Sequence, residues 1–231
     1  MSPNPALLTW PSSVGEALVP TYATAVGSAA NASAYAFTNV AIGAASASRT
    51  VLVAVTTAGY PSGADSNASV TSVTVGGLPA TIDHGTWGNP ASQGQSVAFA
   101  RIAVPEGETA TIEVTMGQVK LSSAIAVWTV DTAITVHSTT GSPPGEKSYS
   151  PSISATTALP PGGFALAAIA RLSNSGPTTL SGEFALRAMN PATIDSGGHW
   201  FFDSVTPTAS VGLVGSDSTY QVLGAIVYQR A

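Results

Sequence analysis

The chain has no cysteine and little charge. Its 231 residues include seven lysines and arginines, twelve aspartates and glutamates, and three histidines. Without cysteine, disulfides and thiolate metal sites are excluded, which also fits assembly in a reducing cytoplasm. Charged residues make up 8% of the chain, whereas ordinary soluble domains carry roughly 25%. The surface must therefore be covered mainly by uncharged small and hydroxyl side chains.

This shortage of charge bears on the partners that the chain can have. Freely soluble monomers usually keep more surface charge, so the composition favours a protein packed against copies of itself or another partner. Binding to phosphate groups needs clustered lysine and arginine. Lys120 and Lys147 stand alone and the five arginines are scattered. We therefore expect no nucleic-acid binding.

Long apolar runs are also missing. No run approaches the roughly 18 uninterrupted apolar residues of a membrane helix, and the nearest, Phe164 to Ala170, has the length of one buried strand. The first residues, Met1 to Pro5, lack the basic start and apolar core of a secretory signal. We expect neither a membrane span nor a signal peptide.

The residues that are present indicate β-structure. Valine, isoleucine and threonine dominate the apolar runs, and glycine or proline interrupts most of them. Thr50–Thr57 has the pattern of a strand buried on both faces, and Thr109–Thr115 alternates apolar and polar side chains. Val70–Val75 and Leu78–Asp83 flank a Gly-Gly pair and predict a hairpin. Together these segments predict an all-β protein, an antiparallel two-sheet sandwich that is jelly-roll-like.

The N-terminal segment has a different composition. Residues 1–33 contain four prolines, which disfavour a regular helix or a central strand. Leu7, Leu8 and Trp10 form one apolar cluster between the prolines. We interpret residues 1–33 as an extended arm that docks on a neighbouring subunit by strand addition, with a disordered terminus as the alternative. Residues 34–231 are then one β-sandwich domain.

The order of segment types along this domain predicts two pseudo-repeated halves, residues 34–131 and 150–231. Phe164–Leu172 is similar to Val51–Thr57 in length and composition. The closing segments of the two halves both carry small residues followed by a large aromatic, Trp128 in one and Tyr228 in the other.

Residues able to carry chemistry are few. His84, His137 and His199 lie in no recognisable motif. Asp195, Ser196 and His199 are triad residue types within five positions, but neighbours in one loop seldom converge in the way that nucleophilic catalysis requires. We therefore predict no catalytic, cofactor-binding or metal-binding residue and no enzyme activity. A polysaccharide hydrolase whose two carboxylates are distant in sequence stays open as a minor alternative.

Aromatic residues provide the candidate contacts with partners. On a strand, Trp200 and Phe202 share one face and Phe201 takes the other. One face is expected in the core, and the other is a candidate contact with a neighbouring subunit. Trp87 is expected in a loop, where it could contact a sugar ring or a protein. The candidate partner-binding residues are Leu7, Leu8, Trp10, Trp87, Trp200 and Phe201.

Several strand-and-turn segments resemble those of structural proteins of tailed-bacteriophage virions. The segments are Phe37–Gly43, Arg49–Val55, Val70–Thr81 and Val104–Val114, and the resemblance extends over residues 34–230. It covers capsid decoration or cement proteins, head fibres, and domains of tail tips or fibres, all β-sandwiches. It implies a virion location, self-association, often as a homotrimer, and a non-enzymatic role.

From this resemblance we expect a capsid decoration or cement protein on the outer surface of the phage head, assembled in the host cytoplasm. Its partners would be the major capsid protein and copies of itself. The alternative is a tail or fibre adhesin that binds a glycan or protein on the host surface.

Overall fold

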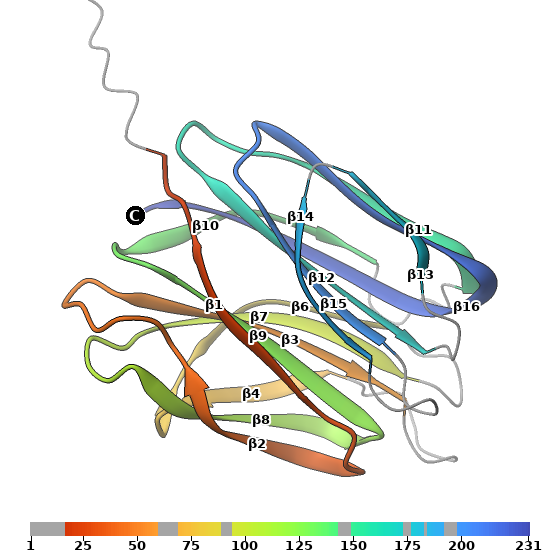
Figure 1. Cartoon of the computed structure of the whole chain (residues 1–231), viewed down its shortest axis with the longest axis horizontal. Helices are drawn as coiled ribbons and strands as arrows, with labels where there is room; N and C mark the ends of the chain where they lie inside the picture. The colour runs from red at the N-terminus through yellow and green to blue at the C-terminus, as the bar shows by residue number, and fades with distance from the viewer. Residues whose placement is uncertain are drawn as a thin grey trace, which may run out of the picture.

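The chain folds into antiparallel β-sheets (Figure 1). The computed structural model describes residues 17–59, 69–88, 94–142, 149–172, 177–182, 184–191 and 198–231. In these residues all the regular elements are strands and all the strand pairs are antiparallel. The predicted all-β antiparallel sandwich is confirmed, although its strands form three hydrogen-bonded sheets where two were expected. The jelly-roll connection is not confirmed. The same residues contain no helix with the length and hydropathy to span a membrane.

Two of the sheets are built from the first half of the chain. Sheet A has the order β1-β9-β3-β7-β6, with bounds Thr21–Ser28 (β1), Ser122–Val130 (β9), Thr50–Ala58 (β3), Gln95–Ala103 (β7) and Thr81–Gly88 (β6). Sheet B has the order β2-β8-β4-β5, with bounds Ala32–Ala41 (β2), Thr109–Lys120 (β8), Val70–Val75 (β4) and Leu78–Pro79 (β5). β4 and β5 form the predicted hairpin around Gly76 and Gly77, which take positive φ angles of 60° and 79°. Its second strand is shorter than the predicted Leu78–Asp83, because it ends at Pro79 and residues 81–83 belong to β6 of sheet A.

Sheet C is built from the second half and bends over on itself. Its strands are Ile134–Gly141 (β10), Tyr149–Ala158 (β11), Phe164–Leu172 (β12), Pro177–Gly182 (β13), Ala185–Pro191 (β14), Gly198–Ser204 (β15) and Thr208–Arg230 (β16). The first part of β16 pairs with β11 and β13, and its last part pairs with β10 and β12. We call β11, β13 and residues 208–219 outer sheet C, and we call β10, β12, β14, β15 and residues 221–230 inner sheet C.

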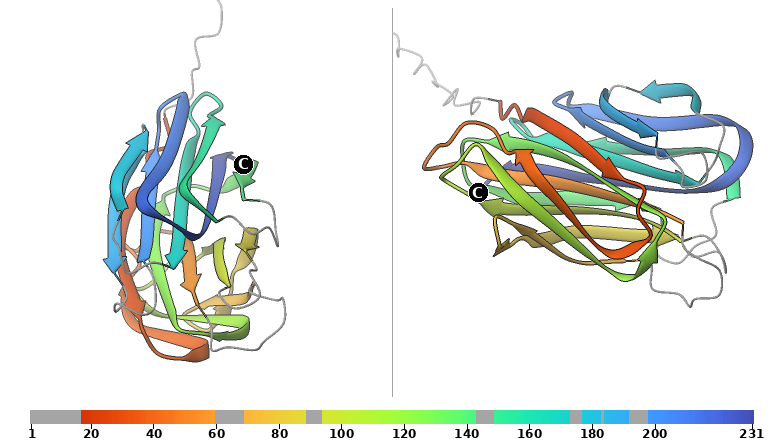
Figure 2. Two further views of the ribbon diagram at one scale, coloured as in Figure 1. Left: turned by 90° about the vertical axis from the view of Figure 1, so that its right-hand side faces the viewer. Right: turned by 60° about the horizontal axis from the view of Figure 1, so that its bottom comes forward.

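The sheets stack in the order B, A, inner C and outer C (Figures 1 and 2). Every residue of β3 is buried, as its sequence predicts. Val53 points into the cluster between sheets A and B, whereas Leu52 points into the cluster between sheet A and inner sheet C. Ala167 of β12 points away from sheet A into a third cluster, which includes Ile153 of β11. Sheet A and inner sheet C are therefore covered on both faces.

Apart from the short strand β5, the described strand pairings of the two halves correspond. In sheet A, β9 lies between β1 and β3, and β7 lies between β3 and β6; in inner sheet C, β16 lies between β10 and β12, and β15 lies between β12 and β14. In the outer layers, β8 pairs with β2 and β4, and residues 208–219 pair with β11 and β13. In the first half, β8 and β9 are two separate strands on either side of Leu121. In the second half, the corresponding residues form one bent strand, β16, of 23 residues.

The N-terminal boundary predicted from the sequence needs correction. Residues 1–16, with Leu7, Leu8 and Trp10, lie outside the described residues. Residues 21–28 are not an arm: they form β1, which pairs with β9 at the edge of sheet A. Tyr22 packs edge-on against Trp128, with 5.7 Å between ring centroids. Proline at position 20 precedes this edge strand, a position where proline is tolerated.

Arg49 holds the loops at one end of sheets A and B. Its side chain is buried, and its guanidinium donates hydrogen bonds of 2.7 Å to the backbone carbonyls of Val104, Gly43 and Glu106. A buried cation needs such partners. This residue therefore joins the loop before β3 to the loop before β8.

A close approach of the two halves at Gly224 predicts the effect of one added methyl group. A Cβ atom at Gly224 in β16 would lie 2.9 Å from Val97 Cγ1 and 3.3 Å from Phe99 Cε2, both on β7. We expect Gly224→Ala to destabilise the protein by about 1–3 kcal/mol because a packed core resists overfilling. The measurement is urea unfolding. Gly85→Ala is the matched control, since the nearest atom to its Cβ would be 3.9 Å away. Equal unfolding midpoints for Gly224→Ala and the wild type would contradict the close packing.

Candidate functional site

Two ion pairs lie at matching places in the two halves. Asp83 and Arg101 pair across β6 and β7, and Arg187 and Asp203 pair across β14 and β15. In each hairpin a bulge holds one partner, Asp83 or Arg187. The positions of acid and base are exchanged between the halves. The acid lies on β6 and the base on β7 in the first half, whereas the base lies on β14 and the acid on β15 in the second.

The two carboxylates are the buried members of these pairs. Arg101 Nε donates to Asp83 Oδ1 at 2.9 Å and Oδ2 at 2.8 Å, while Arg187 donates through Nε at 2.6 Å and Nη2 at 2.7 Å to the two oxygens of Asp203. The side chains of Asp83 and Asp203 are 4% and 5% exposed. The hydrogen bond to Asp203 raises the pKa of Arg187. Such charge-assisted bonds satisfy carboxylates that would otherwise be costly to bury.

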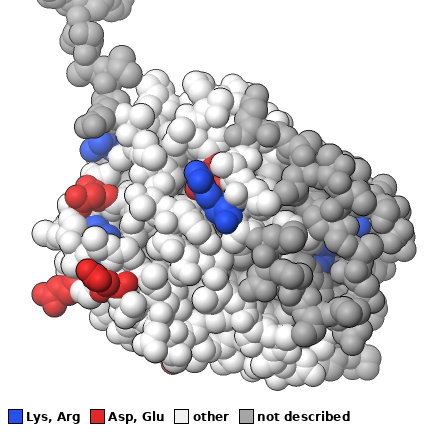
Figure 3. All heavy atoms as spheres, viewed as in Figure 1, with Lys and Arg blue, Asp and Glu red and all other residues white. Residues whose placement is uncertain are grey.

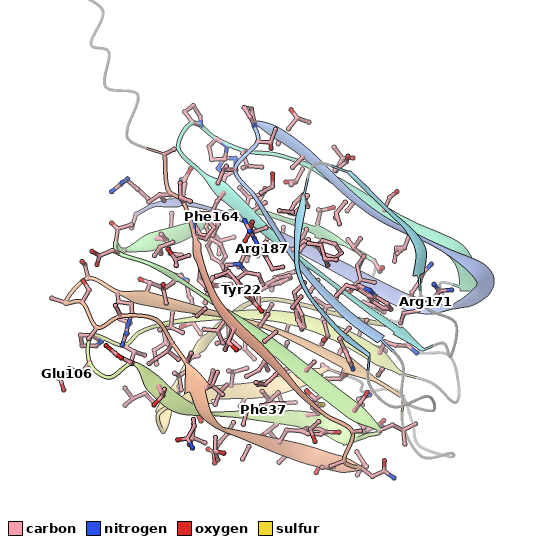
Figure 4. The ribbon with its side chains drawn as sticks, in the orientation of Figure 1. Tyr22, Phe37, Glu106, Phe164, Arg171 and Arg187 are labelled. Atoms are coloured by element: carbon pink, nitrogen blue, oxygen red, sulfur yellow. The ribbon has the colours of Figure 1, made fainter. Side chains whose placement is uncertain are left out.

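Each carboxylate also accepts a hydrogen bond from the opposite half. Trp128 Nε1 of β9 donates to Asp203 Oδ2 at 2.8 Å, and the Tyr228 hydroxyl of β16 donates to Asp83 Oδ2 at 3.0 Å. Burial raises the pKa of Tyr228 well above its ordinary value, and the charge of Asp83 raises it further. In the view of Figure 4, Arg187 is labelled at the level where sheet A faces inner sheet C, between the labels of Phe164 and Tyr22. These bonds link the halves reciprocally.

A pocket of about 330 Å³ lies beside the first ion pair. Arg101, Thr50 and Thr81 contribute its polar lining, and Pro79, Ile102, Ala103, Ala133 and Ile134 complete it. Arg101 is fixed there, since its Nη1 also donates to the Ile134 carbonyl at 2.6 Å. The pocket is thus a small surface hollow with one immobilised guanidinium.

His199 and Ser122 meet at the opposite end of the strands. Ser122 Oγ lies 3.1 Å from His199 Nε2, and the imidazole is 1% exposed. Burial lowers the pKa of His199 to about 3, so the ring is neutral near pH 7. Within the part of the chain that the structure describes, His199 Nδ1 has no hydrogen-bond partner. A serine nucleophile needs an oriented base and access to substrate, and these residues supply neither.

Other polar side chains are buried near the same strand ends. They are Gln95, Ser96, Lys120, Ser123, Arg171 and Gln221. Burial lowers the pKa of Lys120 to about 8, and its Nζ lies 3.5 Å from the Gly94 carbonyl oxygen. Over the described ranges, no three histidine, aspartate or glutamate side chains group in a way that could hold a metal ion.

The aromatic residues predicted as partner contacts lie elsewhere than expected. Trp200 is 3% exposed and Phe201 is fully buried, so neither can contact a neighbouring subunit from these positions. Both faces of β15 are covered, one by outer sheet C and one by sheet A, which the sequence of a single strand does not reveal. The predicted alternation is confirmed, since Trp200 and Phe202 share one cluster and Phe201 joins another. Trp87 is not in a loop but in β6, opposite Ser96, and is partly buried.

The outer face of sheet B is a surface of mostly small and hydroxyl side chains. It carries the side chains that alternate with the buried ones on three strands: Ala34, Ala36 and Thr38 of β2, Thr109, Thr111, Glu113, Thr115 and Val119 of β8, and Ser72 and Thr74 of β4. Within the strands of sheet B, Glu113 is the one exposed charge, and it accepts a hydrogen bond of 3.1 Å from Thr74 Oγ1. The alternation of Thr109–Thr115 predicted this outward orientation, although the sequence alone did not single the face out.

A second face is similarly poor in charge. In Figure 3, Arg187, labelled in Figure 4, stands in the middle of a broad field of uncharged side chains on the described part of that face, with the carboxylate beneath it. The acidic side chains visible there, among them Glu106, gather at one end. Comparison of the sequence with protein-family models and with curated proteins finds no match to either.

The reciprocal bonds predict a measurable loss of stability. We expect Tyr228→Phe to lower the free energy of unfolding by about 1–3 kcal/mol, because the carboxylate of Asp83 loses a buried donor. Tyr22→Phe is the control, since no hydrogen bond of its hydroxyl is found among the described residues, and it should cost less than about 0.5 kcal/mol. Urea unfolding of both variants tests this. The interpretation fails if the two substitutions have the same effect.

His199 predicts a dependence of stability on pH. Its pKa is about 3 in the folded protein against an ordinary value of 6.5. Between these values the unfolded chain binds a proton that the folded chain does not, so stability is complete above pH 6.5 and falls as the pH decreases towards 3. We expect this single group to contribute a loss of roughly 1.4 kcal/mol per pH unit. Burial also lowers the pKa of His84, which acts in the same direction.

The measurement is the free energy of unfolding at several pH values between 3 and 7.5. His199→Gln should flatten the slope below pH 6.5, whereas His137→Gln, which changes an exposed histidine, should leave the slope unchanged. An unaltered slope in His199→Gln would show that this ring does not control acid sensitivity.

Proposed function

We propose that the chain is a non-enzymatic structural protein of a tailed-phage virion, a decoration or cement protein that binds the outer surface of the head. The observation that carries this proposal is the outer face of sheet B, a surface mainly of serine, threonine and alanine, with Val119 at one end and Glu113 as its one exposed charge. The cores of protein interfaces are depleted of charged residues. This face can therefore be covered by a partner without desolvating a series of ions.

The proposed mechanism is the bridging of neighbouring major-capsid subunits. Each copy would add buried area where two capsid subunits meet, and repetition over the lattice would make individually modest contacts strong. The stacked sheets suit this role, because sheet A and inner sheet C are covered on both faces and give the outer face of sheet B a rigid support.

The resemblance of residues 34–230 to virion structural proteins supports the same role. Three of the segments that carry the resemblance form strands of sheet B and the loops beside them. They are Phe37–Gly43, Val70–Thr81 and Val104–Val114. Self-association as a homotrimer and attachment through Leu7, Leu8 and Trp10 stay predictions, since those three residues lie outside the described part of the chain.

A tail or fibre adhesin is the second candidate. Trp87 is partly exposed near the end of β6, where it could contact a host glycan or protein. Binding to a glycan array that is lost in Trp87→Ala would favour this role.

The test of the decoration role uses labelled full-length protein and phage particles that lack it. We expect the label on the head, and we expect the double variant Thr111→Lys/Thr115→Lys to bind at least about 10-fold more weakly, because two charges would be buried in the interface. His137→Lys, which places a charge at an exposed position of β10, should bind like the wild type. Label confined to the tail would reject the decoration role, and full binding by the double variant would reject sheet B as the contact.

A further inference from the structure

The pocket beside Arg101 differs from the matching place in the other half. Arg187 uses Nε and Nη2 together on Asp203. Arg101 uses Nε on Asp83 and Nη1 on the Ile134 carbonyl. Among the described residues no acceptor contacts Arg101 Nη2, and the side chain is 32% exposed. The first half therefore presents an immobilised donor at the surface, inside a hollow.

The hydroxyl groups of the pocket add complementary hydrogen-bonding capacity. Thr50 Oγ1 donates to the Thr132 carbonyl at 2.9 Å, so its lone pairs are left to accept. Thr81 is exposed, and its hydroxyl can both donate and accept. Pro79 and Ile102 line the same space with apolar surface. The pocket thus combines a few fixed polar groups with an apolar wall, the usual composition of small-ligand sites.

The local charge argues for a neutral ligand. Asp83 compensates the charge of Arg101 at 2.8 Å. The pocket lining contains no other charged residue. An anion would gain little net attraction from a compensated pair that is partly open to salt. A neutral hydroxyl group, in contrast, needs only directed donors and acceptors.

We infer that this pocket binds a single neutral pyranose unit of a glycan, with ring hydroxyls on Arg101 Nη2, Thr81 and Thr50 and the C–H face of the ring against Pro79 and Ile102. A volume of about 330 Å³ suits one small ring. Because Arg101 is already held by its partners, binding orders little of the protein. The inference does not depend on a position on the phage head, and it concerns a site distinct from Trp87.

The experiment is a titration of the ¹⁵N-labelled full chain followed by amide chemical shifts. The probes are methyl α-D-glucopyranoside, methyl α-D-mannopyranoside and methyl β-D-galactopyranoside, with sodium glucuronate as the acidic counterpart. We expect at least one neutral glycoside to shift the amides of Thr81, Ile102 and Ala133 in a saturable manner, at millimolar to tens of millimolar concentrations.

Three variants make the result specific. Ala133→Phe fills the pocket, leaves the residues of the ion pair in place and should abolish the shifts, whereas Ala36→Phe, the same change on the outer face of sheet B, should preserve them. Thr81→Val, at an exposed position, should weaken binding by about 3- to 10-fold through the loss of one hydrogen bond. The inference is overturned if all three neutral glycosides leave the amides unshifted, if Ala133→Phe binds like the wild type, or if glucuronate alone binds.

Discussion

Sheet A packs against inner sheet C through a continuous apolar contact, and this contact decides where the other layers lie. Leu52, Phe99 and Trp128 meet Leu166, Phe201 and Tyr228 there. Both sheets also bury their second faces, so the contact joins two complete sandwiches rather than closing one. At Gly224 the sheets approach so closely that Val97 Cγ1 would lie 2.9 Å from an added Cβ. Small residues at this crossing are therefore as necessary as the large ones around it.

The reciprocal hydrogen bonds give this apolar contact a defined geometry. Apolar contacts are not directional, whereas the hydrogen bonds of Trp128 to Asp203 and of Tyr228 to Asp83 form at one relative position of the halves. We therefore assign the buried carboxylates a role in specifying alignment, a role that buried polar groups have in some other proteins. The arginines donate the remaining hydrogen bonds to the carboxylates. They use different donor atoms, and this difference leaves Nη2 of Arg101 able to donate to a ligand.

Local patterns in the sequence were enough to predict the strands, but not to predict how the sheets stack. The alternation of Thr109–Thr115, the burial of Thr50–Thr57 on both faces and the hairpin at Gly76 and Gly77 all follow from neighbouring residues. The burial of Trp200 and Phe201 does not, because it depends on layers contributed by β3, β9 and β11. The ion pairs were also missed, since nothing local links Asp83 to Arg101 or Arg187 to Asp203. A signal was present, however: in a chain with 8% charged residues, an arginine within a run such as Ser96–Val104, or an aspartate after Phe202, needs a partner.

The layered structure gives separate explanations for the high hydrophobic content and the low charge of the chain. A hydrophobic share of 44% could mean exposed apolar surface, but the large apolar side chains exposed among the described residues are Val19, Leu78, Val119, Leu186 and Val205. The other large apolar side chains are instead buried or partly buried, many of them in three clusters between the four layers. Low charge therefore cannot be explained by the core, and it is a property of the surface itself. A hydroxyl-rich face such as that of sheet B remains compatible with water while it carries little charge to desolvate, and this combination suits a face that is exposed before assembly and covered afterwards.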